Sequence, residues 1–176
     1  IRANGEAWCW GSNGSGQLGD GSQSIALSPV RVSGLTGVQA LSTSHGDSVS
    51  PGHSCAVLID GSAWCWGSGL LGELGNGMGA VSLWPVPVSG LTESTGIASG
   101  QEHSCAVRTN GEAWCWGDNS HGQLGDGNAP TGSLVPVQVS GMADVVAITA
   151  GNAHSCALQA AGTVWTCALV LTTVGR

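Results

Sequence analysis

The sequence has no lysine, phenylalanine or tyrosine, and it has few ionised side chains of either sign. Charged residues make up 9% of the chain, against roughly 25% in an average globular domain, and the formal net charge is −7. The cations are single, scattered arginines: Arg2, Arg31, Arg108 and Arg176. Because binding a phosphate backbone requires several clustered cations, the composition argues against nucleic acid and anionic membrane surfaces as partners.

Long apolar runs are also missing. The longest, residues 164–171, is far shorter than the roughly 20 residues that span a bilayer, so no membrane insertion is expected. The sequence begins at Ile1 without a basic and then apolar leader, so we expect any export signal to have been removed or to lie outside it. A hydrophobic content of 41% is nevertheless enough for a core, and eight tryptophans supply the large aromatic side chains. We therefore expect a single repeat domain over residues 1–176.

One segment recurs in three near-copies: GEAWCWGSNGSGQLGDG from Gly5, GSAWCWGSGLLGELGNG from Gly61, and GEAWCWGDNSHGQLGDG from Gly111. A proline-valine block and then an HSCA block follow each copy. A fixed period of this length indicates a repeat architecture. The expected repeats are residues 5–60, 61–110 and 111–161, with a partial repeat at 162–176.

Each repeat contains four short strand signals separated by Gly, Asp, Asn and Ser, and no helical periodicity. The strands are expected in the HSCAV, EAWCWG and PVPVSG blocks and in a small-residue segment such as 96–100 or 145–151. Pro85 and Pro87 cannot donate to a strand ladder, which places their strand at a sheet edge. The predicted fold class is all-β: four-stranded antiparallel sheets that form about three and a fraction β-propeller blades, with a solenoid as the competing geometry.

The combined motif is H-S-C-A-[VL], then G-x-[AV]-W-C-W-G-x-N-x-x-G-[QE]-L-G-[DN]-G, then P-V-x-V-S-G. It closely resembles the repeat of the regulator-of-chromosome-condensation family, and the resemblance covers nearly the whole chain. The resemblance implies blades of a seven-bladed propeller. Three and a fraction blades do not close such a ring alone, so the propeller is expected to be partial or completed by another chain.

Four cysteines are predicted to pair across hairpins. If each hairpin has a three-residue loop that ends in glycine, Cys105 faces Cys115, and Cys55 faces Cys65. Directly opposed residues have Cα atoms about 4.5 to 5.5 Å apart, within reach of a disulfide. Free buried cysteines are the alternative, whereas metal binding is disfavoured because ligand pairs normally lie two to four residues apart. Disulfides would place the protein in an oxidising compartment, outside the cell or on its surface.

The other cysteines, Cys9, Cys156 and Cys167, lie toward the ends of the sequence. The position that faces Cys156 is Thr166, and Cys167 is shifted by one place onto the other face of its strand. We hypothesise that Cys156 forms an intermolecular disulfide with Cys9 of another copy. Two chains would then make a six-bladed ring, or chains would add head to tail.

Catalytic and cofactor sites are not expected. His103 lies two residues before Cys105, but this pattern occurs in every repeat and no unique acid or base accompanies it, so a Cys-His nucleophile is disfavoured and no enzyme is predicted. The glycine-rich runs lack both the lysine of a phosphate loop and the acid spacing of a calcium loop, so neither a cofactor nor a metal is predicted. Trp114 and Trp116 share one strand face, which indicates packing between blades, with a sugar-stacking platform as the alternative.

In a repeat protein, the residues that all copies share build the scaffold, and the residues that differ between copies can serve to recognise a specific partner. The main hypothesis is therefore a non-catalytic extracellular module that binds a protein partner through non-repeated loops gathered on a common rim. The resemblance agrees, since one group of relatives engages a small GTPase and chromatin, and a secreted bacterial group inhibits β-lactamases. The alternatives are a self-assembling structural repeat with ends completed by another chain, and lectin-like glycan binding. Six residues are the partner-binding candidates: His45, Asp47, Trp84, Glu102, Asn119 and His121.

Overall fold

The computed structural model describes residues 1–46 and 51–167, without the side chain of residue 167, and Asp47 lies outside this part. The described residues form thirteen β-strands and no helix, hence no helix that could cross a membrane. In chain order the strands are β1 (Trp8–Gly11), β2 (Ala26–Arg31), β3 (Val38–Thr43), β4 (His53–Leu58), β5 (Ala63–Gly67), β6 (Ser82–Pro87), β7 (Ser94–Ser99), β8 (His103–Arg108), β9 (Ala113–Gly117), β10 (Ser133–Gln138), β11 (Val145–Ala150), β12 (Ser155–Gln159) and β13 (Val164–Cys167).

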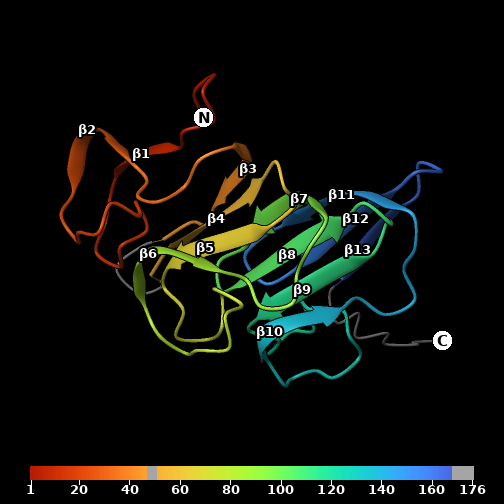
Figure 1. Ribbon diagram of the computed structural model, residues 1–176. Helices are drawn as coiled ribbons and strands as arrows, with labels where there is room; N and C mark the ends of the chain where they lie inside the picture. The colour runs from red at the N-terminus through yellow and green to blue at the C-terminus, as the bar shows by residue number, and fades with distance from the viewer. Residues whose placement is uncertain (47–50, 168–176) are drawn as a thin grey trace.

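The strands form four antiparallel sheets that follow one another along the molecule (Figure 1). Two sheets are four-stranded, β3-β4-β5-β6 and β7-β8-β9-β10, while β1-β2 has two strands and β11-β12-β13 has three. Strand β7 contacts β3 and β4, and β11 contacts β7 and β8, so the first strands of the last three sheets lie at the junctions between these sheets. The predicted all-β fold with four-stranded blades is confirmed. We call the sheets blades 1 to 4 in chain order.

The proline-bearing strands lie at sheet edges, as predicted. Strand β6 contains Pro85 and Pro87 and is the last strand of blade 2, and β10 contains Pro136 and is the last strand of blade 3. A proline in a central strand would leave one ladder hydrogen bond unmade, and this loss is avoided at an edge. The small-residue strands β7 and β11 are at the opposite edge, beside the neighbouring blade.

The hairpins have the predicted register. Cys105 is paired with Cys115 in β8 and β9, and Cys55 is paired with Cys65 in β4 and β5. The turn glycine Gly111 has a φ of 79°, in the left-handed region. A Cβ atom on Gly111 would lie 2.8 Å from the Cα of Asp144, so the close approach of this turn to the next blade also requires glycine.

The hydrophobic core is divided into layers between blades rather than gathered in one centre. Leu18, Leu74 and Leu124 occupy the same position in the three motif copies, and each is buried in a different cluster. Trp66 of blade 2 packs in the Leu18 cluster, and Trp116 of blade 3 packs in the Leu74 cluster. The prediction that these leucines lie between blades is confirmed, and each blade depends on its neighbour for burial.

Candidate interaction surface

Two disulfides fasten the central hairpins. The Cys55–Cys65 bond has an S–S distance of 2.13 Å and a Cα–Cα distance of 4.1 Å, and for Cys105–Cys115 these are 2.09 Å and 4.0 Å. The two predicted disulfides are therefore observed, and they indicate an oxidising environment. Cys9 and Cys156 are free, and Cys156 faces Thr166 as predicted.

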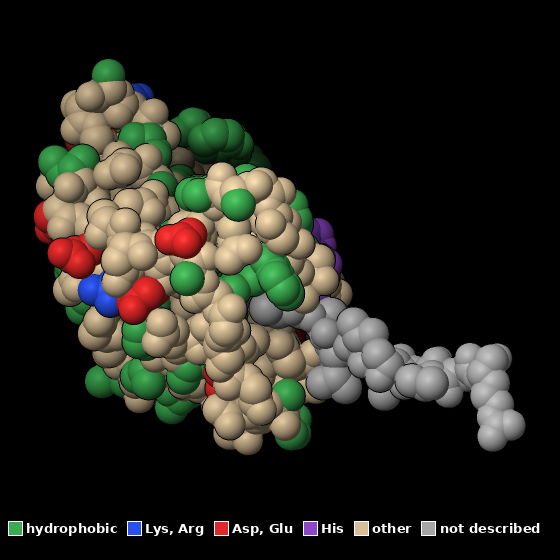
Figure 2. Space-filling model, turned by 90° about the vertical axis from the view of Figure 1, so that its right-hand side faces the viewer, with side chains coloured by type: hydrophobic (Ala, Val, Ile, Leu, Met, Phe, Trp, Pro, Cys, Tyr) green, Lys and Arg blue, Asp and Glu red, His purple; other side chains and the backbone are tan. Residues whose placement is uncertain are grey.

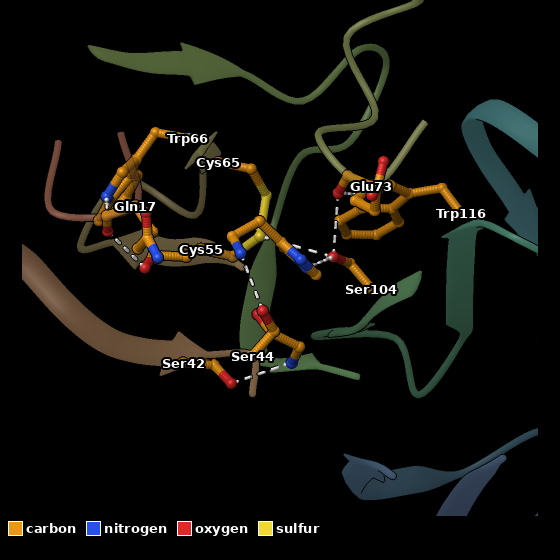
Figure 3. Close-up of a disulfide and its surroundings, with 12 residues drawn as sticks. Gln17, Ser42, Ser44, Cys55, Cys65, Trp66, Glu73, Ser104 and Trp116 are labelled. Atoms are coloured by element: carbon orange, nitrogen blue, oxygen red, sulfur yellow. Dashed lines mark hydrogen bonds between the residues drawn. A yellow bond between two sulfur atoms is a disulfide. The ribbon is translucent and has the colours of Figure 1, made fainter. Parts of the chain in front are cut away.

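Tryptophans in two of the motif copies bridge neighbouring blades. Trp66 donates its indole N–H to the carbonyl oxygen of Gln17 at 2.9 Å, and Trp116 donates to that of Glu73 at 2.7 Å. Both side chains are fully buried, which confirms packing between blades for these two. Figure 3 shows the Cys55–Cys65 disulfide between these two contacts. Trp10 holds the same position in the first motif but is 64% exposed.

Histidines make a second recurring bridge. His53 Nε2 lies 2.8 Å from Ser104 Oγ of the next blade, and His103 Nε2 lies 2.9 Å from Ser155 Oγ. Burial lowers the pKa of His53 to about 3 and that of His103 to about 4, so both rings are neutral at physiological pH. The nearby Cys55 and Cys105 are in disulfides and cannot form the thiolate of a nucleophile. This arrangement fastens blades together.

Asn119 holds its own loop. Its side-chain oxygen accepts the backbone N–H of Leu124 at 3.0 Å, and its amide nitrogen donates to Asp126 Oδ1 at 3.1 Å. Asn13 makes the same contacts with Leu18 and Asp20 in the first motif. Because the side chain of Asn119 is buried in this scaffold role, we leave it out of the binding surface proposed below.

A buried acid replaces glutamine in the second motif. Glu73 accepts the backbone N–H of Leu71 at 2.8 Å and the hydroxyl of Ser68 at 3.2 Å. Gln123, at the same position in the third motif, accepts the N–H of His121 at 2.9 Å. Burial raises the pKa of the Glu73 carboxyl. Both side chains shape the tip of the loop between the third and fourth strands of their blade.

The loops that follow the odd-numbered strands lie at one end of the blades. Pairing of His53 with Gly67, and of His103 with Gly117, places these strand ends together. We call this end the loop rim; its described residues are 12–25, 44–46, 51–52, 68–81, 100–102, 118–132 and 151–154.

Besides the buried Asn119, four sequence-predicted residues lie on or next to this rim. His45 is exposed and lines a cavity of about 390 Å³ with Gln101, directly before Glu102. His121 is exposed with its Nδ1 2.9 Å from Ser120 Oγ. Trp84, in β6 just after the rim, is 55% exposed, and its indole lies against Gly21.

Five exposed apolar side chains gather between blades 2 and 3. Gly77 donates its N–H to the carbonyl of Leu134 at 2.9 Å, and Gly79 lies close to both Leu70 and Leu134. We call the following set the apolar cluster: Leu70 (60% exposed), Leu71 (45%), Met78 (65%), Leu134 (41%) and Val135 (41%). The other motif copies have Gly-Ser and Ser-His where this one has Leu70 and Leu71, a difference that the choice of candidate residues missed.

The rest of the surface carries few charges, and other exposed apolar side chains, such as Leu27 (96% exposed) and Ile59 (78%), lie elsewhere on it. Figure 2 shows one face with few acidic or basic side chains, on which hydrophobic side chains form separate groups. Arg108 lies 3.0 Å from Glu112 and 3.4 Å from Glu93, and Arg31 lies 3.2 Å from Glu6. Within residues 1–46 and 51–167, no group of three potential metal ligands forms. The apolar cluster is therefore distinguished by its departure from the other motif copies at Leu70 and Leu71 rather than by charge.

The chain matches known proteins along most of its length. The family model for the regulator of chromosome condensation (RCC1) repeat matches residues 4–57, 60–107 and 110–158. Human E3 ubiquitin-protein ligase HERC2 is 36% identical over 77 residues, which is 44% of this chain and 2% of HERC2. The Ultraviolet-B receptor UVR8 of Arabidopsis thaliana is 34% identical over 77 residues, 44% of this chain and 17% of UVR8. The chain thus spans a small part of these relatives.

Solved structures show the same architecture. Human WBSCR16 aligns with a TM-score of 0.77 at 22% identity, over 94% of this chain and 42% of that protein. Prp20p from Saccharomyces cerevisiae aligns with a TM-score of 0.73 at 25% identity, over 93% of this chain and 39% of that protein. With three repeats matched and this propeller-type fold, the chain belongs to the regulator of chromosome condensation (RCC1) repeat family.

Proposed function

We propose that this chain is a non-catalytic, extracellular protein-binding module, which engages its partner through the loop rim and above all through the apolar cluster. The cluster is the observation that carries the proposal. Its members Leu70, Leu71 and Met78 are exposed and differ from the equivalent residues of the other motifs, so the repeating scaffold does not require them. Exposed apolar side chains that lie close together on a protein surface are candidates for interaction sites.

Two further observations support this function. Yeast RCC1 (Prp20) has been crystallised with Kap60 bound, and Prp20p has binding properties toward Gsp1p and histones. Protein binding is thus attested for proteins with this fold. Here the disulfides favour an extracellular setting. The recurring Cys side chains fasten hairpins within blades and the His side chains bridge neighbouring blades, which supports a binding role rather than a catalytic one.

The test is comparative capture of secreted and surface proteins from the organism that produces the chain. Wild-type protein, the Leu70→Ser/Leu71→Ser variant and a Leu27→Ser control are immobilised, and bound proteins are quantified by mass spectrometry. Leu27 is a suitable control because it is 96% exposed on β2, in another motif. We expect at least one protein to be enriched by wild type and by the control but about tenfold less by the double variant. A capture profile that the double variant leaves unchanged would contradict the proposal.

A second candidate function is glycan binding at Trp84. Its half-exposed indole lines a small cavity of about 160 Å³ with Trp64 and Ser33, which offers an aromatic face beside a hydroxyl. Aromatic faces are suited to stacking against sugar rings. A glycan array in which wild-type protein and a Trp84→Ala variant give the same signals would reject this candidate.

A further inference from the structure

A cavity of about 390 Å³ lies where the first strands of blades 2, 3 and 4 reach the loop rim. Its walls are the last residues of β3, β7 and β11 and the residues directly after these strands. Strand β7 contacts both β3 and β11, so the three strand ends are neighbours. Volumes of about 300–1,000 Å³ are typical of small-molecule sites, and we call this one the inner cavity.

The backbone around the inner cavity is fixed by contacts between blades. Gln101 donates its N–H to the carbonyl oxygen of Gly151 in the next blade at 3.2 Å, and Ser99 donates its N–H to Ser42 Oγ of the preceding blade at 2.9 Å. A Cβ atom on Gly100 would lie 2.6 Å from the oxygen of Gly151, so this close approach requires glycine. The cavity therefore has walls that are in place before any ligand binds.

Three side chains at equivalent positions differ from blade to blade. His45, Gln101 and Asn152 each lie two residues after the end of the first strand of their blade, and all three line the inner cavity. The recurring contacts between blades are made by other residues, as His53 and Trp66 illustrate. The scaffold therefore needs no particular side chain at these three positions, and they are free to recognise a ligand.

Ser99 has an unpaired hydroxyl group at the cavity wall. The residue is only 8% exposed, and its Oγ has no hydrogen-bond partner within residues 1–46 and 51–167. A buried hydroxyl without a partner is unfavourable, and such groups are generally paired in folded proteins. Since Ser99 lines the inner cavity, an occupant of this cavity can supply the partner.

The chemistry of the wall selects the class of occupant. Among the described residues, the lining contains no Asp, Glu, Lys or Arg, so a charged ligand would lose water without gaining an ion pair. An apolar ligand would leave the Ser99 hydroxyl unpaired. The hydroxyls of Ser99 and Thr43 and the amides of Gln101 and Asn152 donate and also accept hydrogen bonds, as the hydroxyls of a sugar do. The lining is therefore complementary to an uncharged molecule with several hydroxyl groups.

We propose that the inner cavity binds a small polyhydroxylated ligand, a monosaccharide or a cyclic polyol, through the hydroxyl of Ser99 and the side-chain amides of Gln101 and Asn152. Because the contacts are few and polar, we expect a dissociation constant on the order of 1 mM. The site is separate from Trp84, which lies on β6 at the opposite edge of blade 2 from β3. It is also separate from the apolar cluster and does not depend on protein binding there.

The test is a titration of isotope-labelled protein followed by its amide NMR spectrum. Glucose, galactose, mannose and myo-inositol are added separately, with acetate and acetamide as small ligands that lack hydroxyl groups. We expect at least one of the four polyhydroxylated compounds to shift the amide signals of Gln101 and Asn152 along a saturating curve, while those of Leu70 and Trp84 stay unchanged. No saturable shift from any of the four, or an equal response to acetate or acetamide, would overturn the proposal.

Two serines on β7 make a matched pair of variants. Ser94, at the other end of β7, is also buried with an unpaired hydroxyl, but it does not line the inner cavity. We expect Ser99→Ala to weaken binding of the responding compound about tenfold, and Ser94→Ala to leave it unchanged. Neither variant removes a side-chain hydrogen bond of the described structure, so both should remain folded, which their amide spectra check. Equal affinities of the two variants would contradict the proposal.

Asn152→Ala adds a test at an exposed side chain, where the fold is not at risk. We expect it to weaken binding about tenfold as well, and an unchanged affinity would count against the proposal. The Leu70→Ser/Leu71→Ser variant should bind the compound as tightly as wild type does, whether or not it captures a protein partner. The sugar titration and the capture experiment therefore test the two proposals separately.

Discussion

Glu73 is the residue at which one motif departs from the others in a buried polar position. Like Gln17 and Gln123 in their loops, Glu73 accepts the backbone N–H of the residue two positions before it, but it does so with a carboxyl whose pKa is raised by burial. The folded protein therefore holds this proton to a higher pH than the unfolded chain does. The resulting loss of stability develops as pH rises through the ordinary carboxyl pKa of about 4.5 and persists at neutral pH.

We predict that Glu73→Gln stabilises the protein by roughly 0.5–2 kcal/mol at pH 7 and by much less at pH 4. The glutamine keeps the acceptor for Leu71 and removes the buried charge. Urea unfolding at the two pH values measures the change. The reverse substitution, Gln123→Glu, brings a carboxyl next to Asp118, with which Gln123 now shares a 2.7 Å hydrogen bond, and should destabilise. A Glu73→Gln variant less stable than wild type at pH 7 would contradict the prediction and show that the Glu73 charge stabilises the fold.

The buried histidines predict a loss of stability in mild acid. Unfolding lets His53 and His103 take up protons near pH 6.5, while in the folded protein their pKa values are about 3 and about 4. Below pH 6.5 the unfolded state therefore binds more protons than the folded state does. For each histidine, the free energy of unfolding decreases by about 1.4 kcal/mol for every pH unit by which the pH is lowered.

This prediction is checked by urea unfolding between pH 6.5 and 5, above the range in which most carboxyls titrate. His103→Gln should reduce the slope by about half, because one of the two proton-binding sites is removed. His121→Gln, on an exposed side chain, is the control and should leave the slope unchanged. A wild-type stability that does not vary over this range would contradict the burial of these rings.

At the scale of the element, the hairpin of β8 and β9 combines a glycine turn, opposed cysteines and a tryptophan that reaches the preceding blade. We predict that Cys105→Ala/Cys115→Ala lowers the free energy of unfolding by about 2–4 kcal/mol, because the unfolded chain is no longer constrained. Urea unfolding under oxidising conditions measures it. Cys9→Ala, which breaks no disulfide within the chain, should cost less than about 1 kcal/mol. Equal losses from the two changes would show that the bridge adds no stability.

The elements were predictable from the sequence because the signals repeat. Three copies of one motif identify the strand segments more clearly than a single copy would. The turn glycine fixes the hairpin register, and counting residues outward from it pairs Cys105 with Cys115. Pro85 and Pro87 placed β6 at an edge because proline lacks an N–H donor. These are short-range relations, which neighbouring residues are sufficient to determine.

The binding surface was less predictable because exposure depends on the neighbouring blade. Asn119 looked like a variable loop residue, but it is buried by contacts with Leu124 and Asp126. The recurrence of Asn and Asp seven residues apart, at Asn13 and Asp20, was a usable signal. Leu70 and Leu71 were not among the candidate residues, and they are exposed where their loop lies close to β10.

At the scale of the whole molecule, equivalent residues differ in importance with the blades beside them. Trp66→Ala and Trp116→Ala should each cost about 3–5 kcal/mol, since both indoles are fully buried between blades. Trp10→Ala should cost less than about 0.5 kcal/mol, because its indole is largely exposed. Urea unfolding of the three variants measures the difference. Similar losses at all three positions would mean that burial by the neighbouring blade is not what stabilises the fold.

The central claim is that this molecule is a row of β-sheets packed on one another, in which each of the two four-stranded sheets is fastened by its own disulfide. Mass spectrometry of peptides from unreduced protein tests it most directly. The account predicts peptides that join Cys55 to Cys65 and Cys105 to Cys115, each within a single chain. Free thiols at these four positions, or crossed pairs such as Cys55 with Cys115, would contradict it.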